Sequence, residues 1–133
     1  MRRWVSDSVT GTDNPTGGEG VVLTITDAGG GSFDYTADYA AMQPVTNPAG
    51  LVVYKSSGVE KGTLTPSGNV LNRTIDDSGV TVTVQIEGQG TRVYPGTSGT
   101  HQGPAATYTC TGTTLQFTTT RGGGDVVDNY TRR

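Results

Sequence analysis

The sequence predicts an all-β domain, namely an antiparallel up-and-down β-barrel of about 8–10 strands, with a β-sandwich as the alternative. Composition is the first observation behind this prediction: hydrophobic residues make up only 32% of the 133 residues, whereas glycine (21) and the β-branched threonine (24) are abundant. Threonine favours strands over helices. The second and third observations are the short apolar–polar alternations along the chain and the turn signals between them. The length suits a single domain over residues 1–133.

The clearest strand is predicted at residues 80–87. Its apolar side chains alternate with polar ones, and these apolar residues are Val80, Val82, Val84 and Ile86. A period of two gives the strand one dry and one wet face. The preceding residues 75–79 contain two aspartates, a serine and a glycine, which are typical of turns. We therefore expect residues 71–75 to pair with residues 80–87 as an antiparallel hairpin.

Further strands are expected on both sides of this hairpin. They cover residues 4–9, 21–26, 33–39, 51–55, 62–65, 107–110, 114–119 and 126–130. Short connections between consecutive strands favour a barrel, because closure removes exposed strand edges. Two connections are longer. Residues 40–50 are expected to hold a helical turn, a lid or an apolar plug, and residues 95–104 to form a mobile loop.

Charge and composition exclude several classes of protein. The net charge is −3 and the pI about 4.9, and five of the nine basic residues lie at or near the chain ends, which argues against nucleic-acid binding. No apolar run approaches the roughly 20 residues of a transmembrane helix. The single cysteine, Cys110, excludes an intrachain disulfide and a cysteine zinc site. We expect it to be an inert thiol in the core.

The candidate catalytic residues are few, and no enzyme, metal site or cofactor is predicted. His101 is the only histidine, and we expect it to be solvated in a loop of glycine, serine and proline. Asp34 and Asp38 share one strand face, a pairing that glycoside hydrolysis or Ca²⁺ binding could use. Asp76 and Asp77 lie in the turn. We interpret both pairs as solvated carboxylates.

The barrel interior is the predicted functional site. A barrel of this size is either filled by its own side chains or holds one small ligand. Apolar and aromatic residues expected to face this interior form the candidate ligand-binding set, and they are Phe33, Tyr35, Tyr39, Met42, Val53, Val82, Val84, Tyr108, Leu115 and Phe117. The alternative interpretation is a packed core without a cavity.

Two short motifs carry a family resemblance. Residues 42–45 read Met-x-Pro-Val, and residues 108–115 read Tyr-x-Cys-x-Gly-x-x-Leu. Together with Trp4, residues 80–88 and the closing residues 130–132, they resemble a secreted or lipoprotein-anchored domain of actinobacteria, which is similar to small lipocalin-like (calycin) barrels. The resemblance implies an extracytoplasmic location, secreted or lipid-anchored at the cell envelope, with the leader absent from this chain. It implies no activity.

The expected function is therefore non-catalytic. The leading hypothesis is binding of a small apolar or amphipathic ligand inside the barrel, and the alternative is a cell-envelope interaction or structural module with a filled core. Nucleic-acid partners and a membrane-spanning segment are not expected.

Overall fold

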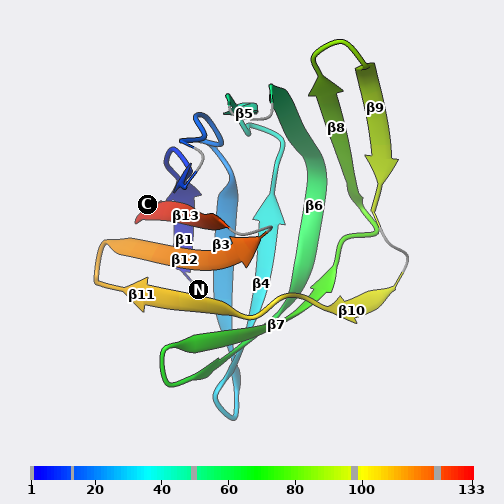
Figure 1. Ribbon diagram of the computed structural model, residues 1–133. Coiled ribbons are helices and arrows are strands. Elements are labelled where there is room, and N and C mark those ends of the chain that lie inside the picture. The colour runs from blue at the N-terminus through cyan, green and yellow to red at the C-terminus, as the bar shows by residue number, and fades with distance from the viewer. Residues whose placement is uncertain (1, 13, 49–50, 97–98, 122–123) are drawn as a thin grey trace.

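The computed structural model describes residues 2–12, 14–48, 51–96, 99–121 and 124–133, and within them the regular elements are all strands. Figure 1 shows their arrangement. Their bounds are β1 Arg2–Ser6, β2 Thr10–Gly11, β3 Val22–Gly29, β4 Ser32–Asp38, β5 Val45–Asn47, β6 Val52–Ser67, β7 Val70–Asp76, β8 Val80–Ile86, β9 Gly90–Pro95, β10 Thr100–Gln102, β11 Ala106–Cys110, β12 Thr114–Arg121 and β13 Gly124–Arg132.

Eight of these strands close into an antiparallel barrel. The ring runs β1–β3–β4–β6–β7–β11–β12–β13 and returns to β1, with each strand antiparallel to both neighbours. Neighbours in the ring follow the order of the chain, so the barrel is up-and-down. The predicted barrel is confirmed, and the alternative sandwich is wrong. Closure leaves the ring strands without free edges, which is the physical gain expected from this architecture.

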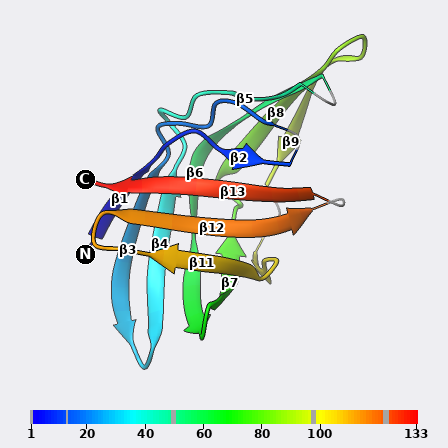
Figure 2. The same ribbon diagram turned by 60° about the vertical axis from the view of Figure 1, so that its left-hand side comes forward.

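A second, open sheet extends from one side of the barrel. The strand β6 has 16 residues; its second half belongs to the ring, whereas residues 52–58 pair with β5 and β8, and β9 pairs with β8. We call β5, β8, β9 and residues 52–58 of β6 the wing (Figures 1 and 2). Gly58 marks the junction: its φ is 90°, and a Cβ there would meet the carbonyl oxygen of Gly79.

The structure corrects the predicted hairpin between residues 71–75 and 80–87. The strand β8 pairs with β6 and β9, whereas β7 pairs with β6, β10 and β11. Because β7 and β8 are both antiparallel to β6, along residues 61–67 and 52–58, they run in the same direction along it. The turn residues Asp77–Gly79 therefore separate two strands, β7 and β8, in which the chain runs on in the same direction along β6. Turn residues show where a strand stops, but not the direction in which the chain continues.

Three other expectations need correction. The strands expected at residues 51–55 and 62–65 are two parts of the single strand β6. Residues 95–104 were expected to be a mobile loop, but they include β10, which pairs with β7; residues 97–98 lie outside the described residues. The strand β9 was not expected, because Gly90–Pro95 lacks apolar alternation. In the connection 40–50, of which residues 49–50 lie outside the described residues, Met42 and Val45 are buried, and Val45 belongs to the short strand β5.

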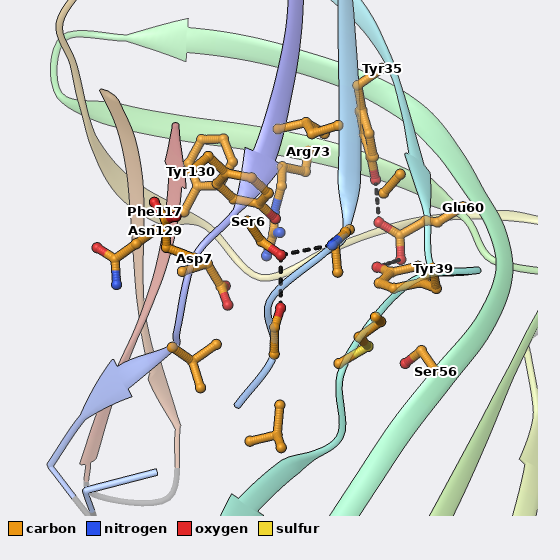
Figure 3. Close-up of a pocket in the computed structure, with 18 of the residues that line it drawn as sticks. Ser6, Asp7, Tyr35, Tyr39, Ser56, Glu60, Arg73, Phe117, Asn129 and Tyr130 are labelled. Carbon is orange, nitrogen blue, oxygen red and sulfur yellow. Dashed lines mark hydrogen bonds between the residues drawn. The ribbon is translucent and has the colours of Figure 1, made fainter. Parts of the chain in front are cut away.

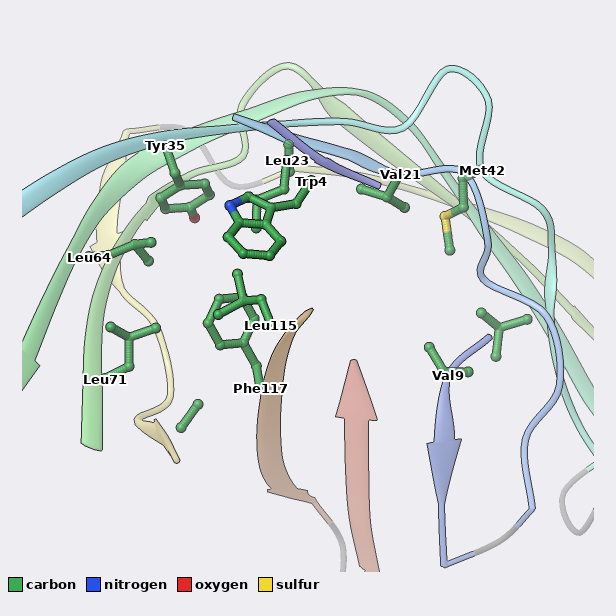
Figure 4. Packing of buried hydrophobic residues seen from close by; sticks show 13 residues of the cluster. Trp4, Val9, Val21, Leu23, Tyr35, Met42, Leu64, Leu71, Leu115 and Phe117 are labelled. Atoms are coloured by element: carbon green, nitrogen blue, oxygen red, sulfur yellow. The ribbon is translucent and has the colours of Figure 1, made fainter. Parts of the chain in front are cut away.

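The core fills the middle of the barrel. Figure 4 shows Trp4 with Leu23, Leu64, Leu115 and Phe117, which come from four different ring strands and are all buried. Trp4 is 2% exposed, and its backbone neighbour across the β1–β3 pair is Leu23. Full burial of such a side chain contributes about 1.5–3 kcal/mol to folding. This layer therefore holds the opposite walls of the barrel together.

Candidate functional site

The barrel has a cavity on each side of this core layer. The apolar cavity, of about 560 Å³, lies at the end that carries the β3–β4 and β6–β7 hairpins, and is lined by Arg2, Trp4, Ile25, Asp27, Phe33, Leu64, Pro66, Leu71, Tyr108, Cys110, Leu115 and Phe117. The polar cavity, of about 230 Å³, lies at the other end (Figure 3). Leu64 and Phe117 line both, so these two side chains stand between them.

The apolar cavity draws its wall from seven of the eight ring strands. Phe33 and Tyr108 pack against the buried core, while Leu71, Leu115 and Phe117 are themselves buried. Its charged side chains are Arg2 and Asp27, both exposed. An apolar wall whose charged groups belong to exposed residues suits an apolar or amphipathic molecule.

The polar cavity is organised around Glu60 on β6. The hydroxyl of Tyr35 donates to Oε2 of Glu60 at 2.9 Å, and the hydroxyl of Tyr39 donates to Oε1 at 3.4 Å. Figure 3 shows both rings converging on this carboxylate. Antiparallel pairing of β4 with β6 sets Ala37 beside Glu60, so Tyr35 on β4 and Tyr39, directly after it, lie on the same face of the wall as Glu60. The two phenols hold the carboxylate in one orientation.

Two further strands bring Arg73 and Tyr130 to the polar cavity: β7, which pairs with β6, and β13, which lies across the barrel. Arg73 donates from Nη2 to the carbonyl oxygen of Pro104 at 3.2 Å. The ring of Tyr130 stands edge-on to Phe117, with ring centroids 5.8 Å apart. Asp128, two residues before Tyr130 on β13, also lines the cavity. The polar cavity therefore contains groups of both charges in a setting rich in aromatic rings (Figure 3).

The three phenols of this cavity are hard to ionise. Burial is the main cause that raises the pKa of Tyr35 and Tyr39 above the ordinary tyrosine value, and the negative charge of Glu60 adds to it. Burial also raises the pKa of Tyr130, and Asp128 is the next cause. A phenolate in this cavity would lose hydration and face carboxylates. All three phenols therefore remain hydrogen-bond donors at neutral pH.

The structure divides the predicted ligand-binding set among three places. Phe33, Tyr108 and Leu115 line the apolar cavity, Tyr35, Tyr39 and Met42 line the polar one, and Phe117 lines both. Val53, Val82 and Val84 lie in the wing, outside the closed ring. This corrects the expectation that these three valines face the barrel interior. Their alternation is real, but β8 pairs with the part of β6 that has already left the ring.

The lumen-facing side of β6 nevertheless continues onto the wing. Tyr54 and Ser56 line the polar cavity, and the pairing of β6 with β8 sets Val84 beside Tyr54 and Val82 beside Ser56. Both valines are half-buried. Val53, one residue away from Tyr54, points to the opposite face of the sheet. One face of the wing thus extends the barrel lumen as an open apolar surface.

Sequence reasoning missed Glu60 and Arg73. Glu60 lies in the part of β6 that was interpreted as a connection, where Lys55 to Lys61 show no apolar alternation. Arg73 lies in a predicted strand, but its inward direction follows from its pairing with the buried Leu64. Charged residues on an inward face give no local signal, because alternation rules take them as solvent-facing.

The remaining candidates take different positions from one another. Asp34 and Asp38 are exposed, and Asp38 accepts a hydrogen bond from the backbone of Ala40. His101 is half-buried in β10, not solvated in a loop, and its Nδ1 is buried without a hydrogen-bond partner among the described residues. Cys110 is exposed, which corrects its expected place in the core.

The turn carboxylates also follow local contacts. Asp76 accepts hydrogen bonds from the backbone and hydroxyl of Ser78, and these bonds lower the pKa of its carboxyl group. Within the described ranges, no three histidine, cysteine, aspartate or glutamate side chains come together as a metal site. The described residues also include no helix with the length and hydropathy needed to cross a membrane.

No protein family, curated protein or solved structure matches this chain in sequence or fold comparisons.

Proposed function

We propose that this protein binds a small apolar or amphipathic ligand, without catalysis, in the apolar cavity of its barrel. The cavity of about 560 Å³, in the middle of the range for small-molecule sites, is the observation that carries the proposal. Its wall includes Phe33, Tyr108 and Leu115, three aromatic or aliphatic side chains whose burial against a ligand would supply the binding energy. About 25 cal/mol is gained for each Å² of apolar surface removed from water, which suffices for micromolar affinity.

The exposed Arg2 and Asp27 suit the polar end of an amphipathic ligand, with the apolar part toward Leu64 and Phe117. The proposal also includes the resemblance to actinobacterial secreted or lipid-anchored domains of lipocalin-like build, and with it an extracytoplasmic location. What supports this part is the Tyr-x-Cys-x-Gly-x-x-Leu hairpin, residues 108–115, which forms the end of β11 and the start of β12 at the apolar cavity.

The cavity can be tested through Cys110, the only cysteine of the chain, which is exposed and lines the cavity. We expect a fluorescent fatty-acid probe to bind saturably with micromolar affinity. A bulky maleimide on Cys110 should block uptake, whereas a methylthio group on the same sulfur should leave it nearly unchanged. The Cys110→Ser variant should bind the probe and be insensitive to the maleimide. Folded protein that takes up no probe would contradict the proposal.

The alternative, an interaction module of the cell envelope, is favoured by one observation on the wing. Val93 is 61% exposed and Tyr94 48% exposed, and both lie on β9, which pairs with β8 and ends the sheet order. Exposed apolar side chains on an edge strand are typical of surfaces that pair with another chain. Absence of probe uptake, together with association that Val93→Lys abolishes, would favour this alternative.

A further inference from the structure

The polar cavity differs from the apolar one in size and charge. Its volume of about 230 Å³ is below the roughly 300–1,000 Å³ of sites for drug-sized ligands. Carboxylates of Asp7, Glu60 and Asp128 line it, whereas Arg73 is the cationic side chain among the described lining residues. A small cavity with this excess of negative charge suits a small cation better than a fatty acid or another anion.

Glu60 is the group that a cation would meet. Its carboxylate is half-buried and accepts hydrogen bonds from the hydroxyls of Tyr35 and Tyr39. Among the described residues, no lysine, arginine or histidine forms an ion pair with it. Phenol hydrogen bonds orient the carboxylate but leave its negative charge in place. A partly buried charge gains most from a partner of opposite charge.

Aromatic rings surround the same space. Tyr35, Tyr39 and Tyr54 line the cavity on the side of β4 and β6, while Phe117 and Tyr130 line it from β12 and β13. The faces of such rings attract a desolvated cation, most strongly when several converge on it. The edge-on contact of Phe117 with Tyr130 keeps the rings of the far wall in place.

Arg73 limits where the cation can lie. Arg73 lies on β7, the strand that pairs with the β6 of Glu60, and its guanidinium donates from Nε and Nη2 to the carbonyl oxygen of Pro104. Like charges repel, so a cation would lie away from this guanidinium and close to the Glu60 carboxylate. The carboxylate, the surrounding rings and the guanidinium together define one position with negative charge, aromatic contact and limited volume.

We propose that the polar cavity binds a small alkylammonium cation, with the charged nitrogen held between the Glu60 carboxylate and the rings of Tyr35 and Tyr39. This site is separate from the one in the proposed function, because Leu64 and Phe117 stand between the two cavities. The ligand classes differ too, since one cavity takes apolar surface and the other takes a positive charge.

The test compares choline with its neutral isostere, in which carbon replaces the quaternary nitrogen. Both have nearly the same shape, so a difference in affinity measures the charge. Isothermal titration of the full chain should show saturable choline binding, and the isostere should bind at least about tenfold more weakly. Equal affinities, or no saturable binding of choline at millimolar concentrations, would overturn the proposal without any variant.

A matched pair of variants locates the site. Glu60→Gln removes the charge with little change of shape, and choline affinity should fall about tenfold. Glu87→Gln makes the same change of net charge at an exposed residue after β8, and should leave the affinity unchanged. If folded Glu60→Gln binds choline as well as the unmodified protein does, or if both variants weaken binding equally, the site is not at Glu60.

The two cavities can be separated in the same sample. Protein with a bulky maleimide on Cys110 should lose the fatty-acid probe but still bind choline, because Cys110 lines only the apolar cavity among the two. Loss of choline binding on labelling would contradict two independent sites and so overturn this proposal. Retained choline binding by protein that never takes up the probe would support it and count against the proposed function alone.

Discussion

The barrel and the wing differ in how their apolar faces are covered. In the barrel, the opposite wall covers the side chains of the core, so that Trp4 is 2% and Leu64 5% exposed. The wing is one layer, in which Val82 and Val84 are only half-buried and Val93 is 61% exposed. Both regions are built from antiparallel strands on the same strand β6. Closure therefore buries these side chains, and strand pairing alone does not.

This difference has an energetic consequence, because hydrophobic stabilisation follows the apolar area removed from water. The barrel core should therefore contribute most of the stability, whereas the wing keeps an apolar surface in contact with solvent. The wing is the region that can change partners at small cost, and the barrel the region that holds its cavities at fixed shape.

The largest expected effect is in the barrel core. Trp4→Ala removes a buried ring from a site between several ring strands, and should lower the free energy of unfolding by about 3–5 kcal/mol. Val84→Ala, the matched wing variant, should cost about 1 kcal/mol or less, because its side chain is only half-buried. Chemical denaturation followed by circular dichroism measures both. Similar losses for the two variants would remove the distinction between barrel and wing.

Alkaline pH should sharpen the comparison, because the phenols with raised pKa lie in the barrel. The folded protein keeps the protons of Tyr35, Tyr39 and Tyr130, whereas the unfolded chain releases them above the ordinary tyrosine pKa of 10.0. Below that pH the three phenols do not change the free energy of unfolding with pH. Above it, each phenol lowers the free energy of unfolding by up to about 1.4 kcal/mol for each further pH unit. In an alkaline titration followed by phenolate absorbance, these three tyrosines should ionise only when the protein unfolds. Their ionisation in the folded protein would contradict this prediction.

The most local expected effect is at the junction of the two regions. Gly58→Ala places a Cβ against the carbonyl of Gly79 at a φ of 90°. It should lower the free energy of unfolding by about 2–3 kcal/mol, and the wing should be the region whose structure is most disturbed. Gly29→Ala is the control, because its φ is 83° and no atom lies within 4 Å of the new Cβ. It should cost about 1 kcal/mol. Hydrogen exchange of β8 amides measures the local change, and equal effects would mean that contact at the junction is unimportant.

Much of the ring could be predicted from local patterns. The strands expected at residues 21–26, 33–39 and 114–119 correspond to β3, β4 and β12, because alternation and turn residues act within a few positions of each other. Part of the candidate site was predicted as well, since Phe33, Tyr35 and Phe117 were expected to face the barrel interior and do line its cavities. Strand boundaries and inward faces are local properties, and the sequence carries them directly.

Three features could not be predicted in this way. The prediction that residues 71–75 and 80–87 form a hairpin was wrong. Both segments pair with β6, which is long enough to take them one after the other. The wing positions of Val82 and Val84 follow from that pairing. Glu60 and Arg73 were missed because an inward charge is recognised only when the opposite wall is in place.

Local patterns in the chain are enough to predict antiparallel strands, the position of most of them and the apolar face of the clearest ones. The closing of the ring, the continuation of β6 into the wing and the meeting of Glu60 with Tyr35 and Tyr39 in a cavity depend on how the whole chain folds. The difference comes from distance along the chain. Alternation is set by neighbouring residues, whereas pairing and burial depend on contacts between segments that are far apart in sequence.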